Sequence, residues 1–234
     1  MKKGTFIVID GTDGTGKATQ TDLLVKKLTK HKIKVKTIDF PQYKNNFFGA
    51  LIGECLAGKY GVDYINIDPH IISVMYAADR WESSSKIREW LDKGYTVIAD
   101  RYVSANQIHQ GGKIDDNKKR AEFLKWLDTM EHKVFKIPRP DAVLYMNLPV
   151  EITLRLLSEK SVLDKKKYLK GRTDLAETNM KHLEDSRRNG MKIVQSLNNW
   201  YDIDCSKDGA INSREEIHEK VFAIVSKVLK IKTK

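Results

Sequence analysis

A glycine-rich loop near the start of the chain constrains the fold more than any other feature. It follows the apolar run Phe6–Ile9, precedes a helical pattern of leucines, and reads Gly11-Thr12-Asp13-Gly14-Thr15-Gly16-Lys17-Ala18-Thr19. Such glycines let backbone N–H groups turn inward toward an anion, and the N-terminus of the following helix points to the same place. Lys17 adds a positive charge where the outer phosphates of a nucleotide would lie. The pattern predicts a nucleotide-binding phosphate loop from Gly11 to Thr19, rather than an ordinary glycine turn.

The loop departs from the usual pattern at one position. A Ser or Thr normally follows the lysine, and its hydroxyl ligates Mg²⁺. This chain has Ala18 there and Thr19 one place later. A methyl group cannot coordinate a metal ion. Either carboxylates and phosphates alone hold the metal, or the loop binds phosphate without catalysing a reaction.

Length and composition are those of one domain. The chain has 234 residues, of which 41% are hydrophobic, enough to bury one substantial core. We therefore expect a single domain over residues 1–234. No apolar run approaches the length that spans a bilayer and no signal peptide is apparent, so we expect a cytoplasmic protein with no membrane partner. Cys55 and Cys205 have no metal-site spacing and are expected to be reduced thiols.

The formal net charge of +11 raises the question of nucleic acid. The basic residues are spread along the chain, apart from one dense run at Lys165-Lys166-Lys167, Lys170 and Arg172. No aromatic residues that could stack on bases alternate with this run. We therefore expect no nucleic-acid partner, and we interpret the run as a loop that faces solvent or phosphate.

Apolar runs alternate with helical patterns along the chain. This order predicts an α/β fold with a doubly wound parallel sheet of about five strands, flanked by helices. The expected strands cover residues 6–9, 32–40, 95–100, 142–146 and 200–204. Because ligands collect at the carboxyl ends of parallel strands, Asp100 and Arg101 are expected to face the same crevice as the phosphate loop.

Helical patterns fill most of the segments between these strands. Asp68-Pro69 is expected to open a helix, and a second helical stretch is expected to close at Gly94. The run from Tyr102 to Gly112 shows no regular period. Residues of about 159–175 are lysine-rich and are interpreted as a lid. Ser213 and Glu216 predict a capping box for the last helix.

Three segments after the loop separate the classes of protein that share it. The nearest match to a guanine-reading Asn-Lys-x-Asp motif is Asn117-Lys118-Lys119-Arg120, which lacks the acid and disfavours a GTPase. The three segments are Phe40-Pro41-Gln42-Tyr43, Asp79-Arg80-Trp81-Glu82, and Asp100-Arg101-Tyr102 leading to Asn106-Gln107 and Gly111-Gly112. Together they resemble the thymidylate kinase family, over a stretch from Gly4 to about Asp204. The resemblance implies a P-loop NTPase fold and phosphoryl transfer from MgATP to dTMP, giving dTDP.

The resemblance also implies roles for single residues. Asp13 would reach the sugar 3′-hydroxyl of the acceptor, and Arg101 would hold the acceptor phosphate close to the donor. Tyr76 would stack on thymine, and Arg80 would hydrogen-bond the base edge. The full set implied at dTMP is Asp13, Phe40, Pro41, Tyr43, Tyr76, Arg80, Arg101, Asn106, Gln107 and His109, with Gln107 or Asn106 completing the reading of the base.

Within the family, Gly14 places this chain with members whose lid supplies a cation, because other members carry an arginine at that position of the loop. The lid cation chosen is Arg172, with Lys170 and Lys165–Lys167 as alternatives. Arg155, before the lid, is expected to reach the ATP phosphates. The implied catalytic set is Lys17, Arg101, Arg172 and Asp13, since converging phosphates repel and need cations between them.

Two departures from the family bear on the acceptor. Tyr43 and Lys44 stand where an arginine is common, and His109 stands where a Tyr or Phe commonly blocks ribonucleotides. They leave open a different acceptor, such as dUMP or UMP. With Ala18 unable to ligate Mg²⁺, Asp100 and Asp13 are the candidates to hold it directly or through water.

Two further readings of the chain differ in class. A regulatory module that binds nucleotide without catalysis would fit Ala18, but it would not need Lys17, Asp100, Arg101 and a cationic lid together. A nucleic-acid binder would rest on net charge alone. The family resemblance implies a homodimer formed through helices away from the crevice.

Overall fold

The predicted parallel sheet is present in the computed structural model, which describes residues 3–61, 66–163 and 180–231, with residues 159–163 described by their backbone only. Its five strands lie in the order β2-β3-β1-β4-β5, and every pairing is parallel. The strands are β1 (Phe6–Gly11), β2 (Val35–Asp39), β3 (Thr96–Asp100), β4 (Ala142–Asn147) and β5 (Trp200–Asp204). All five expected strands and the α/β class are therefore confirmed.

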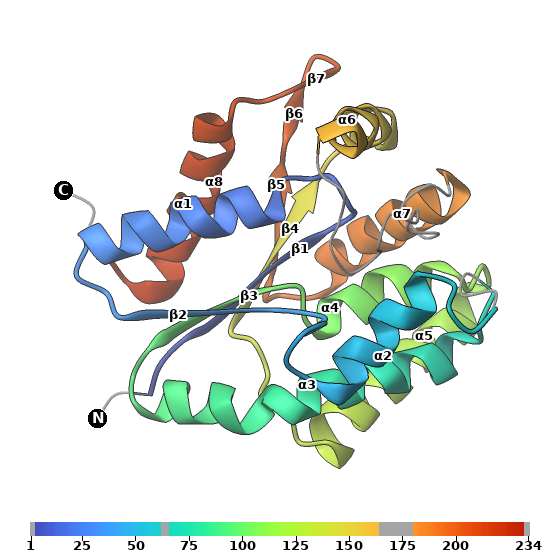
Figure 1. Ribbon diagram of the computed structural model, residues 1–234. Helices are drawn as coiled ribbons and strands as arrows, with labels where there is room; N and C mark the ends of the chain where they lie inside the picture. Colours follow the sequence, from blue (N-terminus) through green and yellow to red (C-terminus); the bar gives the residue numbers. More distant parts are fainter. Residues whose placement is uncertain (1–2, 62–65, 164–179, 232–234) are drawn as a thin grey trace.

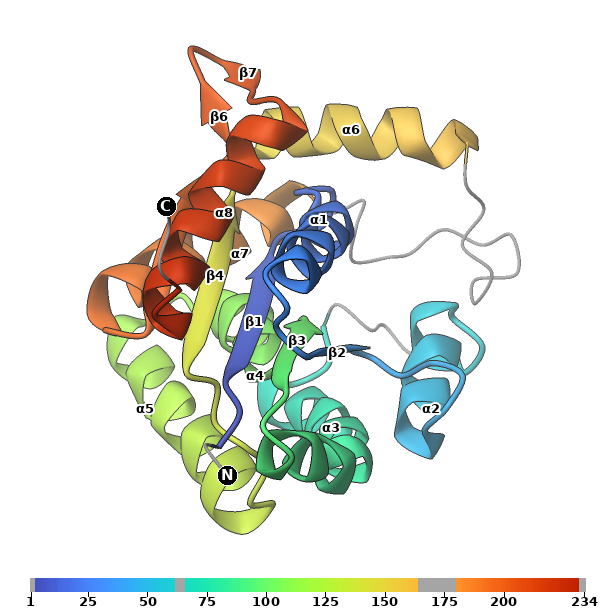
Figure 2. The ribbon, with the colours of Figure 1, turned by 90° about the vertical axis from the view of Figure 1, so that its left-hand side faces the viewer.

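Helices cover both faces of the sheet (Figure 1). One face carries α1 (Lys17–Lys30) and α8 (Arg214–Leu229), and the other carries α3 (Pro69–Asp92), α4 (Val103–Ala105), α5 (Asn117–Asp128) and α7 (Met180–Ser196). The remaining helices are α2 (Phe47–Leu56), the π-helical turns η1 (Asn106–Gln110) and η2 (Thr129–Val134), and α6 (Val150–Leu163), which begins just beyond the carboxyl end of β4 (Figure 2). None of the helices in the described ranges is long and apolar enough to cross a membrane.

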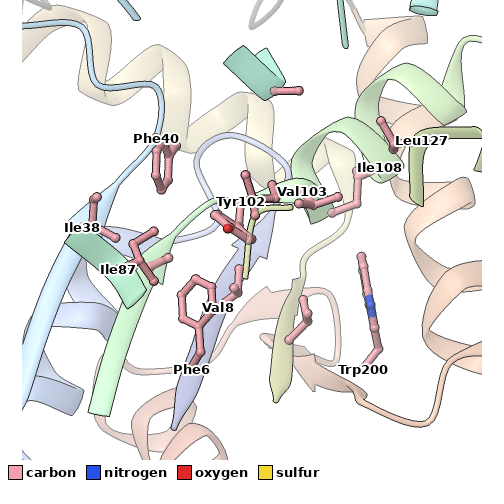
Figure 3. Close-up of a cluster of buried hydrophobic side chains, with 14 of the residues drawn as sticks. Phe6, Val8, Ile38, Phe40, Ile87, Tyr102, Val103, Ile108, Leu127 and Trp200 are labelled. Atoms are coloured by element: carbon pink, nitrogen blue, oxygen red, sulfur yellow. The ribbon is translucent and has the colours of Figure 1, made fainter. Parts of the chain in front are cut away.

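Alternation along β1 explains why both faces need a helical cover. Phe6 and Val8 pack into the core under α3, α5 and α7, shown in Figure 3, whereas Ile7 and Ile9 pack against α1 and α8. All four side chains are fully buried. Successive residues of a strand point to opposite faces, so a continuous apolar run is the pattern of a strand that is buried on both sides.

Between Asp68 and Gly94 the expectation of two helical stretches is wrong. The segment forms one helix, α3, over Pro69–Asp92, and Asp68 caps it by accepting a hydrogen bond from His70 N at 2.8 Å. Ser83 and Ser84 do not interrupt it, because Asn46 donates to Ser83 Oγ at 2.9 Å and Arg88 donates to Ser84 Oγ at 2.8 Å. Both hydroxyl oxygens therefore accept hydrogen bonds from side chains within the continuous helix.

Two other segments differ from the sequence-based picture. The run after Tyr102, which has no regular period, is helical and passes from α4 into the π-helical turn η1. A short hairpin of β6 (Ser206–Lys207) and β7 (Ala210–Ile211) was not predicted. Its turn residues, Asp208 and Gly209, both have positive φ, and Asp-Gly is a hairpin signal that the sequence does contain. The expected capping box at Ser213 and Glu216 is confirmed.

Candidate active site

The phosphate loop joins β1 to α1 and is arranged around Lys17. The Lys17 ammonium donates to the carbonyl oxygens of Gly11 at 3.1 Å and Thr12 at 2.8 Å, and Thr15 Oγ1 also donates to Thr12 O at 2.9 Å. Gly14 and Gly16 have φ angles of 80° and 84°, a backbone conformation that residues with a side chain rarely adopt. The loop therefore closes on itself around a buried ammonium that begins the first turn of α1.

The loop is held tightly between β4 and α6. A Cβ atom on Gly11 would lie 2.6 Å from the carbonyl oxygen of Met146, in the adjacent strand β4. A Cβ atom on Gly14 would lie 3.1 Å from Leu157 Cγ, in α6. Helix α6 therefore contacts the phosphate loop, and it also carries the exposed Arg155 two residues before Leu157.

Arg101 follows β3 and lies opposite this loop. Strand β3 is next to β1, with Ile9 in register with Asp100, and Arg101 N donates to Ile9 O at 3.0 Å. This turn gives Arg101 a φ of 65°. Its guanidinium forms an ion pair with Asp13 of the loop. The structure thus brings together four predicted site residues from two segments: Asp13, Lys17, Asp100 and Arg101.

The charges in this crevice shift one another's pKa values. Burial lowers the pKa of Lys17, and the nearby Arg101 charge lowers it further. Burial raises the pKa of Asp100, while Lys17 and Arg101 act in the opposite direction. Burial disfavours the charge on Arg101, but the carboxylates of Asp13, Asp10 and Asp100 prevail and raise its pKa. Lys17 and Arg101 thus place two positive charges close together beside carboxylates, an arrangement suited to bind an anionic ligand.

Asp10 belongs to this crevice, and sequence reasoning gave it no role. It is fully buried, accepts a hydrogen bond from Gly11 N at 2.8 Å, and accepts another from the hydroxyl of Ser104. It therefore joins the phosphate loop to the helical segment that follows Arg101. An acid that ends an apolar strand immediately before a glycine loop is the sequence signal that could have identified it.

The segment from Phe40 to Asn46 forms one wall beside the crevice. The Phe40–Pro41 peptide bond is cis, and Phe40 itself lies in the core against Tyr102. The Asp79 carboxylate accepts from Gln42 N at 3.1 Å and from Asn46 Nδ2 at 2.8 Å. This brings Tyr43, which is half-buried, close enough to Arg101 to act on its charge.

Arg80 lies in a buried network rather than at the surface. The exposed fractions of the Arg80 and Glu131 side chains are 1% and 0%, and the two form an ion pair. Glu82, the surface partner that adjacency in sequence suggests, instead accepts hydrogen bonds from the first backbone N–H groups of α2. Asn106 also donates to Glu131, at 3.2 Å. Tyr76 is half-buried one helical turn before Arg80 and shares its face of α3.

Gln107 and His109 take different positions. Gln107 lines a separate cavity of about 360 Å³ between α5, α7 and β5, which no other predicted site residue lines. His109 lies next to Arg101, with 3.5 Å between its Nε2 and a guanidinium nitrogen, and its Nδ1 is 3.2 Å from Ser186 Oγ. Burial, with His182 and Arg101 adding to it, lowers the pKa of His109 well below its ordinary value. Of the two candidates to complete the base reading, Asn106 is the one that shares a network with Arg80.

The remaining predicted residues lie at the start of α1 or outside the described ranges. Ala18 is exposed and Thr19 half-buried in the first turn of α1. Arg172, Lys165–Lys167 and Lys170 lie outside the described residues, as does the lid beyond Leu163, while residues 159–163 continue α6. Within the described ranges, no three His, Cys, Asp or Glu residues gather as a metal site.

The fold and crevice define a class of protein. A parallel sheet with a phosphate loop after its first strand, and with Arg101 facing that loop, belongs to the P-loop phosphotransferases. The family model described as thymidylate kinase matches residues 9–205. The chain belongs to the thymidylate kinase family, and it is therefore a nucleoside-monophosphate kinase.

Individual relatives span nearly the whole chain. A thymidylate kinase of Plasmodium falciparum is 28% identical, covering 97% of this chain and 92% of the relative. A probable thymidylate kinase of Methanocaldococcus jannaschii is 29% identical, covering 97% and 99%. The solved structure of thymidylate kinase from Candida albicans superposes with a TM-score of 0.71 at 22% identity, over 96% of this chain and 92% of that one. This last likeness supports the fold.

Proposed function

We propose that this protein transfers the terminal phosphoryl group of ATP to dTMP, giving dTDP and ADP for deoxynucleotide synthesis. Family membership supports the reaction, and one geometric observation supports its location: the Arg101–Asp13 ion pair joins the acceptor side of the crevice to the phosphate loop. The loop from Gly11 to Thr19 holds the ATP phosphates through its backbone N–H groups and Lys17, and Arg155 approaches them from α6.

In this proposal Arg101 and Asp13 exchange partners when the acceptor binds. The guanidinium leaves the Asp13 carboxylate for the acceptor phosphate, which it can hold through two parallel N–H groups. Asp13 is then able to accept a hydrogen bond from the sugar 3′-hydroxyl. Arg101 and Lys17 thus lie on opposite sides of the transferred group and offset the charge that develops during transfer.

Magnesium belongs to the same proposal, and the acids of the crevice fit it. Mg²⁺ in kinases is held by one or two carboxylates together with phosphate oxygens and water, so it does not need three protein ligands, and no such group is found among the described residues. Asp100 would hold the ion directly or through water, with Asp13 as the second candidate. The ion would supply positive charge beside the phosphates.

The acceptor base would lie against α3. Tyr76 stacks on the ring, and Arg80 and Asn106 bind its edge. Phe40, Pro41, Tyr43, Gln107 and His109 complete the acceptor set as shaping or supporting residues, and His109 stands at the position that decides between deoxyribose and ribose.

A panel of acceptors tests this function. ADP release would be measured with dTMP, dUMP and UMP under the same conditions, and dTMP should give the highest kcat/KM. A preference for UMP would support the alternative of another nucleoside-monophosphate kinase. Binding of ATP with no turnover of any monophosphate would support the non-catalytic module instead.

The lid cation gives a separate expectation. Arg172→Ala should lower kcat by about a hundredfold or more with little change in the KM for dTMP, because a lid cation acts on the charge of the transferred group. Steady-state kinetics of this variant beside Lys170→Ala would check it. Wild-type turnover in Arg172→Ala would remove the assignment, and a loss confined to Lys170→Ala would transfer it to that lysine.

We also propose that the protein is a homodimer in the cytoplasm. Exposed apolar residues support the dimer: Ile71, Val74 and Trp81 share one face of α3 and are 62%, 41% and 55% exposed, and Phe47 of α2 is 70% exposed nearby.

The cysteines support the cytoplasmic location. The free thiols Cys55 and Cys205 suit a reducing compartment.

Substituting the centre of this apolar face should separate the protomers. Trp81→Glu should give a monomer, because it places a charge in an apolar interface. Light scattering after size exclusion would measure the mass. Val134→Glu is the matched control, since Val134 is 65% exposed on η2 and should leave the mass unchanged. A wild-type protein that already elutes as a monomer would contradict the dimer.

A further inference from the structure

Glu131 is a buried carboxylate that no sequence motif singled out. It lies on the π-helical turn η2, and its side chain is fully buried. Its Oε2 accepts from Arg80 Nε at 2.9 Å, and its Oε1 accepts from Arg80 Nη2 and from Asn106 Nδ2. Burying an ion pair costs several kcal/mol per charge in desolvation, so it is a poor way to gain stability. A gain in stability therefore does not explain why the fold buries this ion pair.

The ion pair leaves one end of the Arg80 guanidinium available. Arginine has five N–H groups in a rigid planar fork. Glu131 uses one on Nε and one on Nη2, and the carbonyl oxygen of Tyr102 accepts one from Nη1 at 3.3 Å. Two N–H groups therefore remain at the tip of the fork, among the contacts that the described residues make. Glu131 holds Arg80 as a hydrogen-bond donor of fixed direction.

The same carboxylate fixes the amide of Asn106. Both hydrogens of Asn106 Nδ2 are used, one by Ser73 O at 3.1 Å and one by Glu131 Oε1 at 3.2 Å. Both of these partners accept hydrogen bonds and neither can donate one, so the amide cannot rotate to present its nitrogen elsewhere. In the described part of the chain, no hydrogen bond reaches Asn106 Oδ1. Glu131 thus holds Asn106 with its oxygen available as an acceptor.

Resting on the proposed function, we propose that Glu131 is the positioning residue that selects the pyrimidine of the acceptor. It sets Arg80 as a donor and Asn106 as an acceptor, which matches a base with a carbonyl at C4 and a hydrogen on N3, as in thymine or uracil. Cytosine presents the reverse pattern, an amino group at C4 and a bare N3. Against cytosine, buried polar groups would be left unpaired, the situation that gives strong discrimination.

Glu131→Gln tests this role because it changes the polarity of the network at almost constant shape. Glu131 Oε2 accepts from Arg80 Nε, and Oε1 accepts from both Arg80 Nη2 and Asn106 Nδ2, so whichever way a glutamine amide turns, its N–H₂ replaces an acceptor that Arg80 or Asn106 uses. The network then no longer holds Arg80 as a donor and Asn106 as an acceptor together. The kcat/KM for dTMP should fall because the KM for dTMP rises. The ratio of kcat/KM for dTMP to kcat/KM for dCMP should decrease by about tenfold or more. The KM for ATP should not change.

Asp128→Asn is the matched control. It is also an acid-to-amide change, three residues earlier in the chain, and Asp128 pairs with the exposed Arg139. Its dTMP-to-dCMP ratio should equal that of the wild type. A purely structural role for Glu131 would lower kcat for both acceptors equally and leave their ratio unchanged, which would overturn the proposal.

A second variant covers the case in which Glu131→Gln does not fold. Glu131→Asp keeps the charge but shortens the side chain by one methylene, so its hydrogen bonds to Arg80 and Asn106 weaken. The ratio of kcat/KM for dTMP to kcat/KM for dCMP should again decrease. An unchanged ratio in folded Glu131→Asp also overturns the proposal. Turnover of dTMP by the wild type is measured first, because its absence would contradict the proposed function itself and says nothing against Glu131 in particular.

Discussion

Replacing Arg101 by alanine is expected to lower kcat for phosphoryl transfer by about a thousandfold or more, the effect typical of a cation that stabilises charge in this transition state. The guanidinium lies between the two halves of the site and pairs with Asp13 of the phosphate loop. Its backbone is fixed by the hydrogen bond from Arg101 N to Ile9 O.

Steady-state kinetics with dTMP and ATP would measure this loss. Arg101→Lys should recover only part of the activity, because an ammonium restores the charge without the two parallel N–H groups. Arg139→Ala serves as the control, since it also removes an arginine from an ion pair, here an exposed one with Asp128. A kcat within about tenfold of the wild type in Arg101→Ala would show that this residue does not act on the transferred group.

Asp100→Asn is expected to lower kcat by about a hundredfold or more and to raise the Mg²⁺ concentration needed for half-maximal rate. Asp100 ends β3 beside Lys17 and Arg101, where a negative charge can hold a cation next to the phosphates. Ala18→Ser should be tolerated within a few-fold, because the hydroxyl that usually ligates the metal is already absent from this chain.

A magnesium titration of both variants would check these expectations. Asp92→Asn is the control, because Asp92 is an exposed acid at the end of α3, away from the carboxyl end of β3. Full Mg²⁺-dependent activity in Asp100→Asn would mean that Asp13 or the phosphates alone hold the ion.

Local sequence was sufficient for most of the sheet. The three central strands β3, β1 and β4 are short apolar runs, as expected of parallel strands buried on both faces. The edge strands β2 and β5 mix apolar and polar residues and are partly exposed. The same local information located the capping residues Asp68 and Ser213, because a cap involves only residues within one turn of each other. The sequence-based predictions were wrong where contacts between distant segments determine the structure. In helix α3, Ser83 accepts a hydrogen bond from Asn46 of another segment, whereas Ser84 accepts one from Arg88 of the same helix.

The candidate site shows the same difference between residues that local sequence identifies and residues that only distant contacts identify. The loop from Gly11 to Thr19, with Asp100 and Arg101, could be proposed from motifs, because phosphate binding needs particular residues at fixed spacing and the carboxyl ends of adjacent parallel strands meet. Glu131 could not be assigned, since nothing in the sequence near it shows its partners. Asp10 has a local signal, its position at the end of an apolar strand before the glycine loop, but the sequence does not show that it meets Ser104. Glu131 meets Arg80 across 51 residues, and Asp10 meets Ser104 across 94.

The sequence by itself therefore determined the α/β class, the phosphate loop and the family, all of which depend on order and spacing along the chain. Only the tertiary structure decided that Arg101 pairs with Asp13, that Asn106 rather than Gln107 joins Arg80, and that a buried carboxylate fixes both. The physical reason is that hydrogen bonds and ion pairs are set by distance and direction in space. A residue's type shows what it can donate or accept, and the fold determines which partner it meets.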